Sequence, residues 1–194
     1  MFAVEVRDLE WRDFAGWAEL YYTRYDEIRT NPELWIYTMD TRPTLSEEAA
    51  LFGSVWKNVL TGNQISSVGE DNGKLVGHCT VFRKGGHVED RHVGVLAIGV
   101  HPDWRGKGLG TRLISHVLNK CEGKFEVIQL TVTEKNLPAR ALYRKMGFAE
   151  SGRLPRAFKR GDAYFDDIVM WRTMGEPKVP ASAAAPGRAT TDDR

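Results

Sequence analysis

The sequence predicts an α/β domain built on a mixed sheet, and three patterns indicate it. An apolar run at 93–100 leads through a glycine-rich turn into an amphipathic helical pattern at 109–121. Two shorter strand-like runs, 65–68 and 75–82, flank Asp71-Asn72-Gly73, which is a strong signal for a hairpin turn. Strand and helix patterns alternate in the second half of the chain, as in domains that pack helices against a sheet.

The first sixty residues predict one short strand and two helices. Alternation over 2–6 is typical of an edge strand, and helix-like spacing over 8–29 predicts a helix that Asn31-Pro32 ends. The aromatic stretch 33–43 has no regular period. A capping box at 44–47 then opens a second helix, which we expect to reach Leu60.

The last part of the chain predicts strands on either side of another helix. We expect a strand over 127–132, a helix over 138–146, a strand near Phe148 and a final strand over 164–171. Asn136 is a good N-cap for that helix, and Gly147 is suited to ending it.

Composition sets broad limits on the function. The 194 residues suffice for a single domain, which we place at 1–174, followed by a disordered Pro- and Ala-rich tail at 175–194. The formal net charge is +1, from 27 basic and 26 acidic residues, so we expect neither nucleic acid nor a membrane as partner. Two cysteines and the absence of a signal-peptide pattern predict a cytoplasmic protein. A homodimer is an open option.

The turn at 105–110 predicts a phosphate site. A glycine-rich turn between strand and helix presents backbone N–H groups at a helix N-terminus, where the helix dipole also favours an anion. The spacing fits neither the dinucleotide fingerprint, which would need a glycine at Thr111, nor the P-loop, since Gly106-Lys107 is followed by Gly108. A phosphorylated cofactor of another kind is therefore expected.

Two motifs identify the family that this sequence resembles. The segment Arg105-Gly106-Lys107-Gly108-Leu109-Gly110 resembles the R-x-x-G-x-G acyl-CoA loop of the GNAT superfamily of N-acetyltransferases. Residues 136–148 resemble its N-x-x-A-x-x-L-Y-x-x-x-G-F segment, in the style of the ribosomal-protein N-terminal acetyltransferases. The resemblance implies acetyl-CoA as cosubstrate, with no metal.

The resemblance also implies a fold and a set of cofactor-binding residues. The expected fold is a central, mostly antiparallel twisted sheet that splays between its fourth and fifth strands, with helices on both faces. The pantetheine arm would lie between those strands. The implied cofactor-binding residues are Ile98, Gly99, Val100, Arg105, Gly106, Lys107, Gly108, Leu109, Gly110, Thr111, Asn136 and Tyr143.

Catalysis requires a proton donor for the leaving thiolate and a route for the proton of the amine. By resemblance, Tyr143 is the donor. Thr131 occupies the position where the ribosomal-protein acetyltransferases carry a glutamate base. His92 is our candidate base, because histidine titrates near neutral pH. The acidic alternatives in the sequence are Glu89, Asp90 and Glu134.

The acceptor is left open between a protein or peptide α-amine and a small-molecule amine. A basic loop over 153–160 would attract an acidic acceptor, whereas Asp166-Asp167 would attract a cationic one. Two other classes of protein are also considered. One is an acyl-CoA-binding module without activity. The other is an interaction domain with an aromatic patch formed by Trp35, Tyr37 and Trp56.

Overall fold

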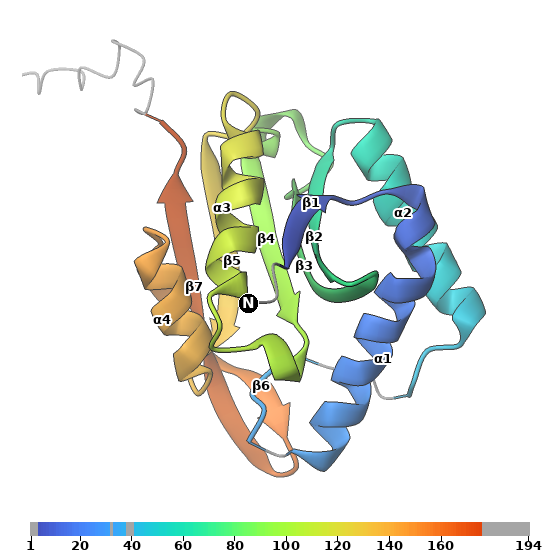
Figure 1. Cartoon of the computed structure of the whole chain (residues 1–194). Coiled ribbons are helices and arrows are strands. Elements are labelled where there is room, and N and C mark those ends of the chain that lie inside the picture. The colour runs from blue at the N-terminus through green and yellow to red at the C-terminus, as the bar shows by residue number, and fades with distance from the viewer. Residues whose placement is uncertain (1–3, 32, 38–40, 176–194) are drawn as a thin grey trace, which may run out of the picture.

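The computed structural model describes residues 4–31, 33–37 and 41–175, which form one seven-stranded sheet with helices packed against it (Figure 1). The strand order is β1-β2-β3-β4-β5-β7-β6. The strands are β1 (Glu5–Asp8), β2 (Gln64–Asp71), β3 (Lys74–Arg83), β4 (Val93–Val100), β5 (Val127–Thr133), β6 (Ala149–Arg160) and β7 (Ala163–Thr173). The helices are α1 (Phe14–Thr30), α2 (Leu45–Leu60), α3 (Leu109–Cys121) and α4 (Leu137–Lys145), with short 3-10 turns η1 (Trp11–Asp13), η2 (Val88–Asp90) and η3 (Pro102–Trp104).

The predicted mixed sheet is confirmed, and so are the predicted hairpin turn and the predicted helix cap. The β4–β5 pair is parallel, and the other pairs of neighbouring strands among the described residues are antiparallel. The hairpin turn between β2 and β3 places Asn72 and Gly73 at φ 50° and 81°, the left-handed values that such turns require. Thr44 and Glu47 form the predicted capping box at the start of α2.

Strand β6 is the main difference from the expected elements. The sequence predicted a short strand near Phe148 and a basic loop over 153–160, but β6 runs from Ala149 to Arg160 along β7. Its first eight residues are exposed, so the period-2 alternation of a half-buried strand is missing. The ladder also shifts register between Leu154 and Phe158, where Arg156 adopts φ 57°. Pairing with β7, rather than local pattern, makes this segment a strand.

The helices cover the two faces of the sheet and bury two clusters of apolar side chains. The larger cluster contains the inner faces of α3 and α4, and the smaller one contains residues of α1, α2 and the strands beneath them. Successive residues of β3 show the two faces. A Cβ on Gly77 would meet Leu113 of α3, whereas the ring of His78 lies against Trp17 of α1. In Figure 1, α3 lies in front of the central strands, and α1 and α2 lie beside β2 and β3.

Parts of the chain predicted from sequence lie outside this description. The expected tail, 175–194, lies outside the described residues except for Gly175, and so do residues 2 and 3 of the first expected strand, 2–6. Within the described residues this strand is β1, Glu5–Asp8, which ends two residues later than expected. Within the described ranges, the helices are too short or too polar to cross a bilayer.

Candidate active site

The glycine-rich turn forms the start of α3, as predicted. Gly106 and Gly108 adopt φ 69° and 82°, and a Cβ at either would meet no atom within 4 Å. Gly108 is the N-cap of α3, and its first turn has neither a side-chain cap nor an acidic residue. Its first N–H groups therefore keep their capacity to bind an anion. Thr111 lies in this first turn, half-buried.

Two residues of the same segment face the protein interior. Leu109 is buried at 3% exposure in the main core, so its side chain cannot meet a ligand, although its backbone can. A Cβ on Gly110 would lie 2.9 Å from Leu142, so this glycine is needed for the packing of α3 against α4. The resemblance implied Gly110 only as a cofactor-binding residue, and the structure adds this packing role.

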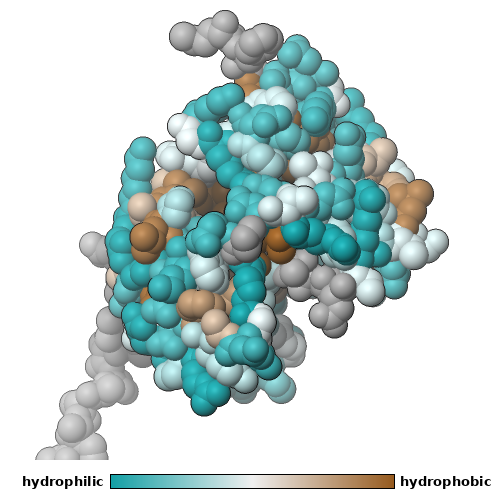
Figure 2. All heavy atoms as spheres, turned by 90° about the horizontal axis from the view of Figure 1, so that it is seen from below, coloured by the Kyte–Doolittle hydropathy of each residue, from teal (hydrophilic) through white to brown (hydrophobic). Residues whose placement is uncertain are grey.

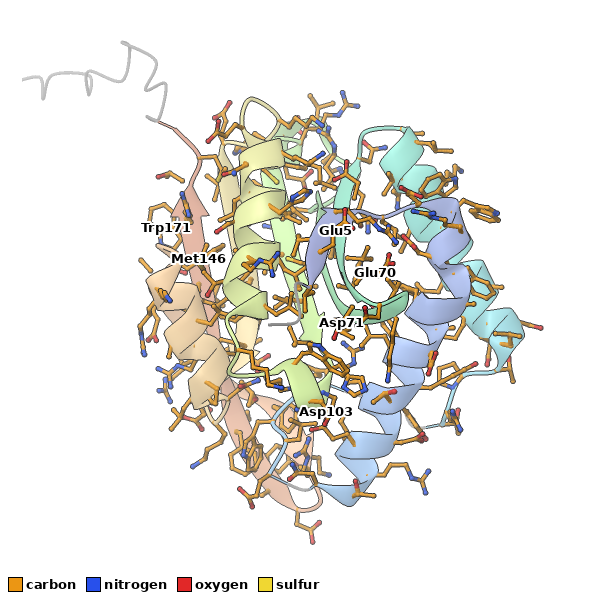
Figure 3. The ribbon with its side chains drawn as sticks, viewed as in Figure 1. Glu5, Glu70, Asp71, Asp103, Met146 and Trp171 are labelled. Carbon is orange, nitrogen blue, oxygen red and sulfur yellow. The ribbon has the colours of Figure 1, made fainter. Side chains whose placement is uncertain are left out.

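The preceding η3 turn holds the loop in place. His101 caps this turn by accepting a hydrogen bond from the Asp103 backbone N–H at 3.3 Å. The Trp104 indole N–H donates to Asp71 at the β2–β3 turn, 3.1 Å away. Figure 3 labels Asp71 and Asp103, which lie near each other in this view. The loop is therefore anchored to the sheet on its N-terminal side.

The two cations of the loop have different surroundings. Arg105 forms a bidentate pair with Glu27 of α1, at 2.5 and 2.7 Å, and its Nε donates to the Val100 carbonyl at 3.0 Å. It therefore ties α1 to the end of β4 rather than standing free beside the loop. Lys107 is exposed and forms no ion pair with the residues that the structure describes. Lys107 is thus the cation available to a phosphate here.

Strands β4 and β5 diverge, as the resemblance implied. Their pairing is limited to Val93–Val95 against Val127–Gln129. Continuing this register would place Ala97 level with Thr131 and Gly99 level with Thr133, but no pairs form there. The divergence opens at the end of β4 that leads into the glycine-rich turn, next to Ile98 and Val100.

The second motif supplies a helix cap and a buried tyrosine. Asn136 accepts a hydrogen bond from the Ala139 N–H at 3.2 Å, which confirms its cap role, and donates to the Trp35 carbonyl at 3.1 Å. Tyr143 is 7% exposed and belongs to the core cluster against which Ile98 and Val100 pack. Burial, and then the neighbouring Cys79 thiol, raise the pKa of Tyr143, so its hydroxyl keeps its proton.

A cavity of about 50 Å³ lies against the diverging half of β4, on the side of α1. It joins three residues of α1, one of β3 and the end of β4. Its lining is Leu20, Tyr21, Arg24, His78, Ala97, Ile98, Gly99, Val100, His101 and Pro102. Figure 2 shows the end of the molecule where this half of β4, the lower end of α1 and the β6–β7 hairpin lie, and its surface is mainly hydrophilic with small hydrophobic areas.

Sequence reasoning missed two polar residues in this cavity, His78 and Arg24. His78 is 5% exposed, and its Nε2 has no hydrogen-bond partner among the described residues. Burial, followed by the positive charge of Arg24, lowers the pKa of His78 to about 4, so the ring is neutral at pH 7. His78 lies in an apolar strand pattern and Arg24 in an ordinary helix, so neither gave a local signal.

The structure argues against His92 as the base. His92 is exposed at the start of β4, where its carbonyl accepts from the Glu126 N–H at 2.9 Å. This is the paired end of β4, a full strand length from the glycine-rich turn. Glu89 and Asp90 lie in η2 on the same side of β4. Glu134 instead accepts hydrogen bonds from Arg153 and from the backbone of β7.

The predicted basic loop is largely occupied by internal contacts. Arg153 pairs with Glu134 and Asp166 at 3.0 and 2.9 Å, and Arg160 donates to carbonyls of the segment 33–37. These contacts belong to strand β6, and they leave less positive charge for an acidic acceptor than a free loop would.

The aromatic residues considered as one partner patch lie in two places. Trp35 packs against Phe165 of β7, with ring centroids 4.6 Å apart, and the Tyr37 hydroxyl donates to Asp167. Trp56 instead lies on α2 against Trp11. Trp35 and Tyr37 thus cover the β6–β7 hairpin, and the three do not form a single patch.

Comparison with known protein families matches the part of the chain that contains the glycine-rich turn and Tyr143. The profile of the Acetyltransferase (GNAT) family matches residues 3–148. The N-alpha-acetyltransferase RimI of Mycobacterium tuberculosis is 35% identical over 105 residues, and the L-amino acid N-acetyltransferase AaaT of Escherichia coli is 31% identical over 107 residues. These matches cover 54% and 52% of this chain and 63% of each relative, so the chain spans less than two thirds of their length.

Solved structures show the same fold at lower identity. A GNAT superfamily phosphinothricin acetyltransferase from Sinorhizobium meliloti, in complex with AcCoA, superposes with a TM-score of 0.76 at 22% identity. The match covers 95% of this chain and 94% of that one.

Proposed function

Because the chain belongs to the GNAT acetyltransferase family, we propose that it transfers an acetyl group from acetyl-CoA to a primary amine by direct attack. The observation that carries this proposal is the meeting of three features at one end of β4. These are the uncapped start of α3 behind Gly106 and Gly108, the divergence of β4 from β5, and Tyr143 in the adjoining core.

The loop fits the pyrophosphate of coenzyme A. The space above Gly106 and Gly108 is open, and the free N–H groups of α3 supply donors for phosphate oxygens. Lys107 adds a positive charge, while Arg105 fixes the loop through Glu27. The pantetheine arm would then follow β4 past Ile98–Val100, along the edge that no longer pairs with β5.

Tyr143 has the properties required of a donor to the leaving thiolate. Its pKa is raised by burial, so it remains a phenol and can donate a hydrogen bond to developing negative charge on sulfur. Full proton transfer is not required for this stabilisation. Backbone N–H groups near the end of β4 are suited to the oxyanion that forms on the thioester carbonyl.

The amine reaches the thioester in its unprotonated form. Thr131 lies exposed on β5, beyond the last residue that pairs with β4, and has no basic group. A weakly basic amine meets this requirement best, since an α-amine with a pKa near 8 costs about 1 kcal/mol to deprotonate at pH 7, against roughly 4 to 5 for lysine. One named relative is an N-alpha-acetyltransferase and the other an L-amino acid N-acetyltransferase, which agrees with an α-amine as acceptor.

Release of free thiol tests the proposal. The full chain is incubated with acetyl-CoA and separate primary amines, namely amino acids, peptides and polyamines, and mass spectrometry identifies the product. We expect thiol release that depends on the amine, with an increase of one acetyl group in its mass. Tight acetyl-CoA binding without acetylation of any amine would instead indicate a binding module.

A further inference from the structure

Arg24 differs from other half-buried arginines of the fold, because its guanidinium has neither a carboxylate nor a hydrogen-bond acceptor among the described residues. Arg7 and Arg140 form ion pairs with acidic residues of other elements, and Arg83 and Arg172 donate hydrogen bonds to oxygen atoms. Arg24 forms no ion pair or hydrogen bond with the residues that the structure describes, and its guanidinium lies 4.5 Å from the ring centroid of Tyr21. Its Nη1 lies 3.4 Å from the point that a Cβ on Gly99 would occupy. An unpaired cation therefore faces the diverging half of β4.

The cavity that contains Arg24 has a net positive charge. No acidic residue lines it. Its two histidines are neutral at pH 7. The pKa of His78 is about 4, and burial, then the charge of Lys74, lowers the pKa of His101. Among nearby acids, Glu27 pairs with Arg105, and Glu48 of α2 is buried, which raises its pKa although the charge of Arg24 acts to lower it. Neither carboxylate forms an ion pair with Arg24 among the described residues, so the guanidinium N–H groups are left for a ligand.

We propose that this cavity binds the carboxylate of a free α-amino acid, with Arg24 as its ion-pair partner and the acceptor amine directed at β4. The inference rests on the proposed acetyl transfer and specifies its acceptor. A volume of about 50 Å³ holds roughly three to five water-sized spheres, which is enough for the three heavy atoms of a carboxylate.

The position of the amine follows from covalent structure. In an α-amino acid one carbon separates the carboxylate from the amine, so a carboxylate on Arg24 places the amine beside Gly99. This is where the thioester would lie if the pantetheine arm follows β4. His78, whose Nε2 lacks a partner, lies in the same cavity and can accept a hydrogen bond from the amine. A peptide N-terminus has no carboxylate at this distance and would leave Arg24 unpaired.

The experiment compares acceptors that keep or lose the carboxylate, and each kcat/KM is expressed per unprotonated amine, because loss of the carboxylate also changes the basicity of the amine. Each protein L-amino acid is tested with acetyl-CoA, and for those acetylated, the corresponding amide and decarboxylated amine are tested. The variants are Arg24→Gln, Arg24→Lys and, as control, Arg29→Gln. Arg29 lies exposed near the end of the same helix, outside the cavity.

We expect the wild type to prefer the acid to its amide by roughly 10- to 150-fold in kcat/KM, the range for hydrogen bonds to charged groups. Arg24→Gln should remove this preference while leaving the amide unchanged, Arg24→Lys should restore part of it, and Arg29→Gln should retain it. Equal kcat/KM for acid and amide, or a preference that survives Arg24→Gln, would overturn the inference and leave acetyl transfer intact.

A binding measurement separates this failure from failure of the proposed function. Calorimetry follows the same L-amino acids added to the wild-type protein saturated with coenzyme A. If no amine is acetylated but an amino acid binds and Arg24→Gln abolishes binding, the carboxylate site stands without the enzyme activity. If no amino acid binds or is acetylated, the inference is overturned.

Discussion

Replacing Gly108 by valine tests the acyl-CoA loop most directly. Gly108 combines φ 82° with the N-cap position of α3, and a Cβ there would meet no neighbouring atom. Steric overlap therefore does not decide the outcome, and the backbone does. A β-branched residue held in this region costs about 1–3 kcal/mol. The chain relieves that strain by rotating the loop, which turns the first N–H groups of α3 away from a phosphate.

The expected loss of acetyl-CoA affinity exceeds tenfold, which corresponds to about 1.4 kcal/mol. Isothermal titration calorimetry gives the affinity, and thermal melting gives the stability of the same samples. Gly123→Val is the matched control, because Gly123 has φ 73°, equally open space around its Cβ position, and a location beyond the other end of α3. Both variants should lose similar stability, but only Gly108→Val should lose affinity. A folded Gly108→Val variant with unchanged affinity would refute the assignment of this loop.

Three further predictions concern the chemistry and the buried histidine. Tyr143→Phe keeps the packed ring but removes the hydroxyl, so acetyl-CoA affinity should stay unchanged while turnover falls by the ~10² to 10⁴ typical of acid–base groups. Near-normal turnover would mean that water, not Tyr143, stabilises the leaving thiolate. Wild-type turnover with a saturating α-amine should rise from about pH 7 toward 9, since the unprotonated fraction limits the rate, and Thr131→Glu should move that rise to lower pH. A flat wild-type profile would contradict this. His78 has a folded pKa of about 4, below its unfolded value near 6.5, so its contribution to stability is present above about pH 6.5 and lost as the pH falls toward 4. Urea unfolding should therefore show that the free energy of unfolding decreases by about 3 kcal/mol over this pH interval. The decrease should be smaller in His78→Phe and unchanged in His92→Phe. Equal pH dependence in all three proteins would count against a neutral, buried His78.

The sequence predicted those elements whose signals are local. Strand β4 and helix α3 have the bounds expected from it, because an apolar run, positive-φ glycines and a helical period follow one another without interruption. The capping box of α2 and the Asn136 cap of α4 also depend on residues three positions apart. Such signals are complete within a few residues.

Features that depend on distant residues could not be predicted in this way. Strand β6 exists through its pairing with β7, although its own residues are mostly exposed. The resemblance implies Arg105 as a cofactor-binding residue, but no local pattern indicates the ion pair that it forms with Glu27 of α1. Arg24 and His78 meet only when α1 packs on β3, and a single sequence has no pattern that joins them.

The short β4–β5 contact has a consequence for the lifetime of the folded protein. Three register pairs join the four-stranded half of the sheet to the three-stranded half, so the strands themselves contribute little to holding the halves together. A ligand that lies between the two halves and binds only the folded state would stabilise their contact. At a free concentration one hundred times its Kd, such a ligand stabilises the fold by about 2.7 kcal/mol. Resistance to proteolysis should therefore increase with acetyl-CoA concentration, and depletion of the cofactor would shorten the survival of the protein as well as stop the proposed acetyl transfer.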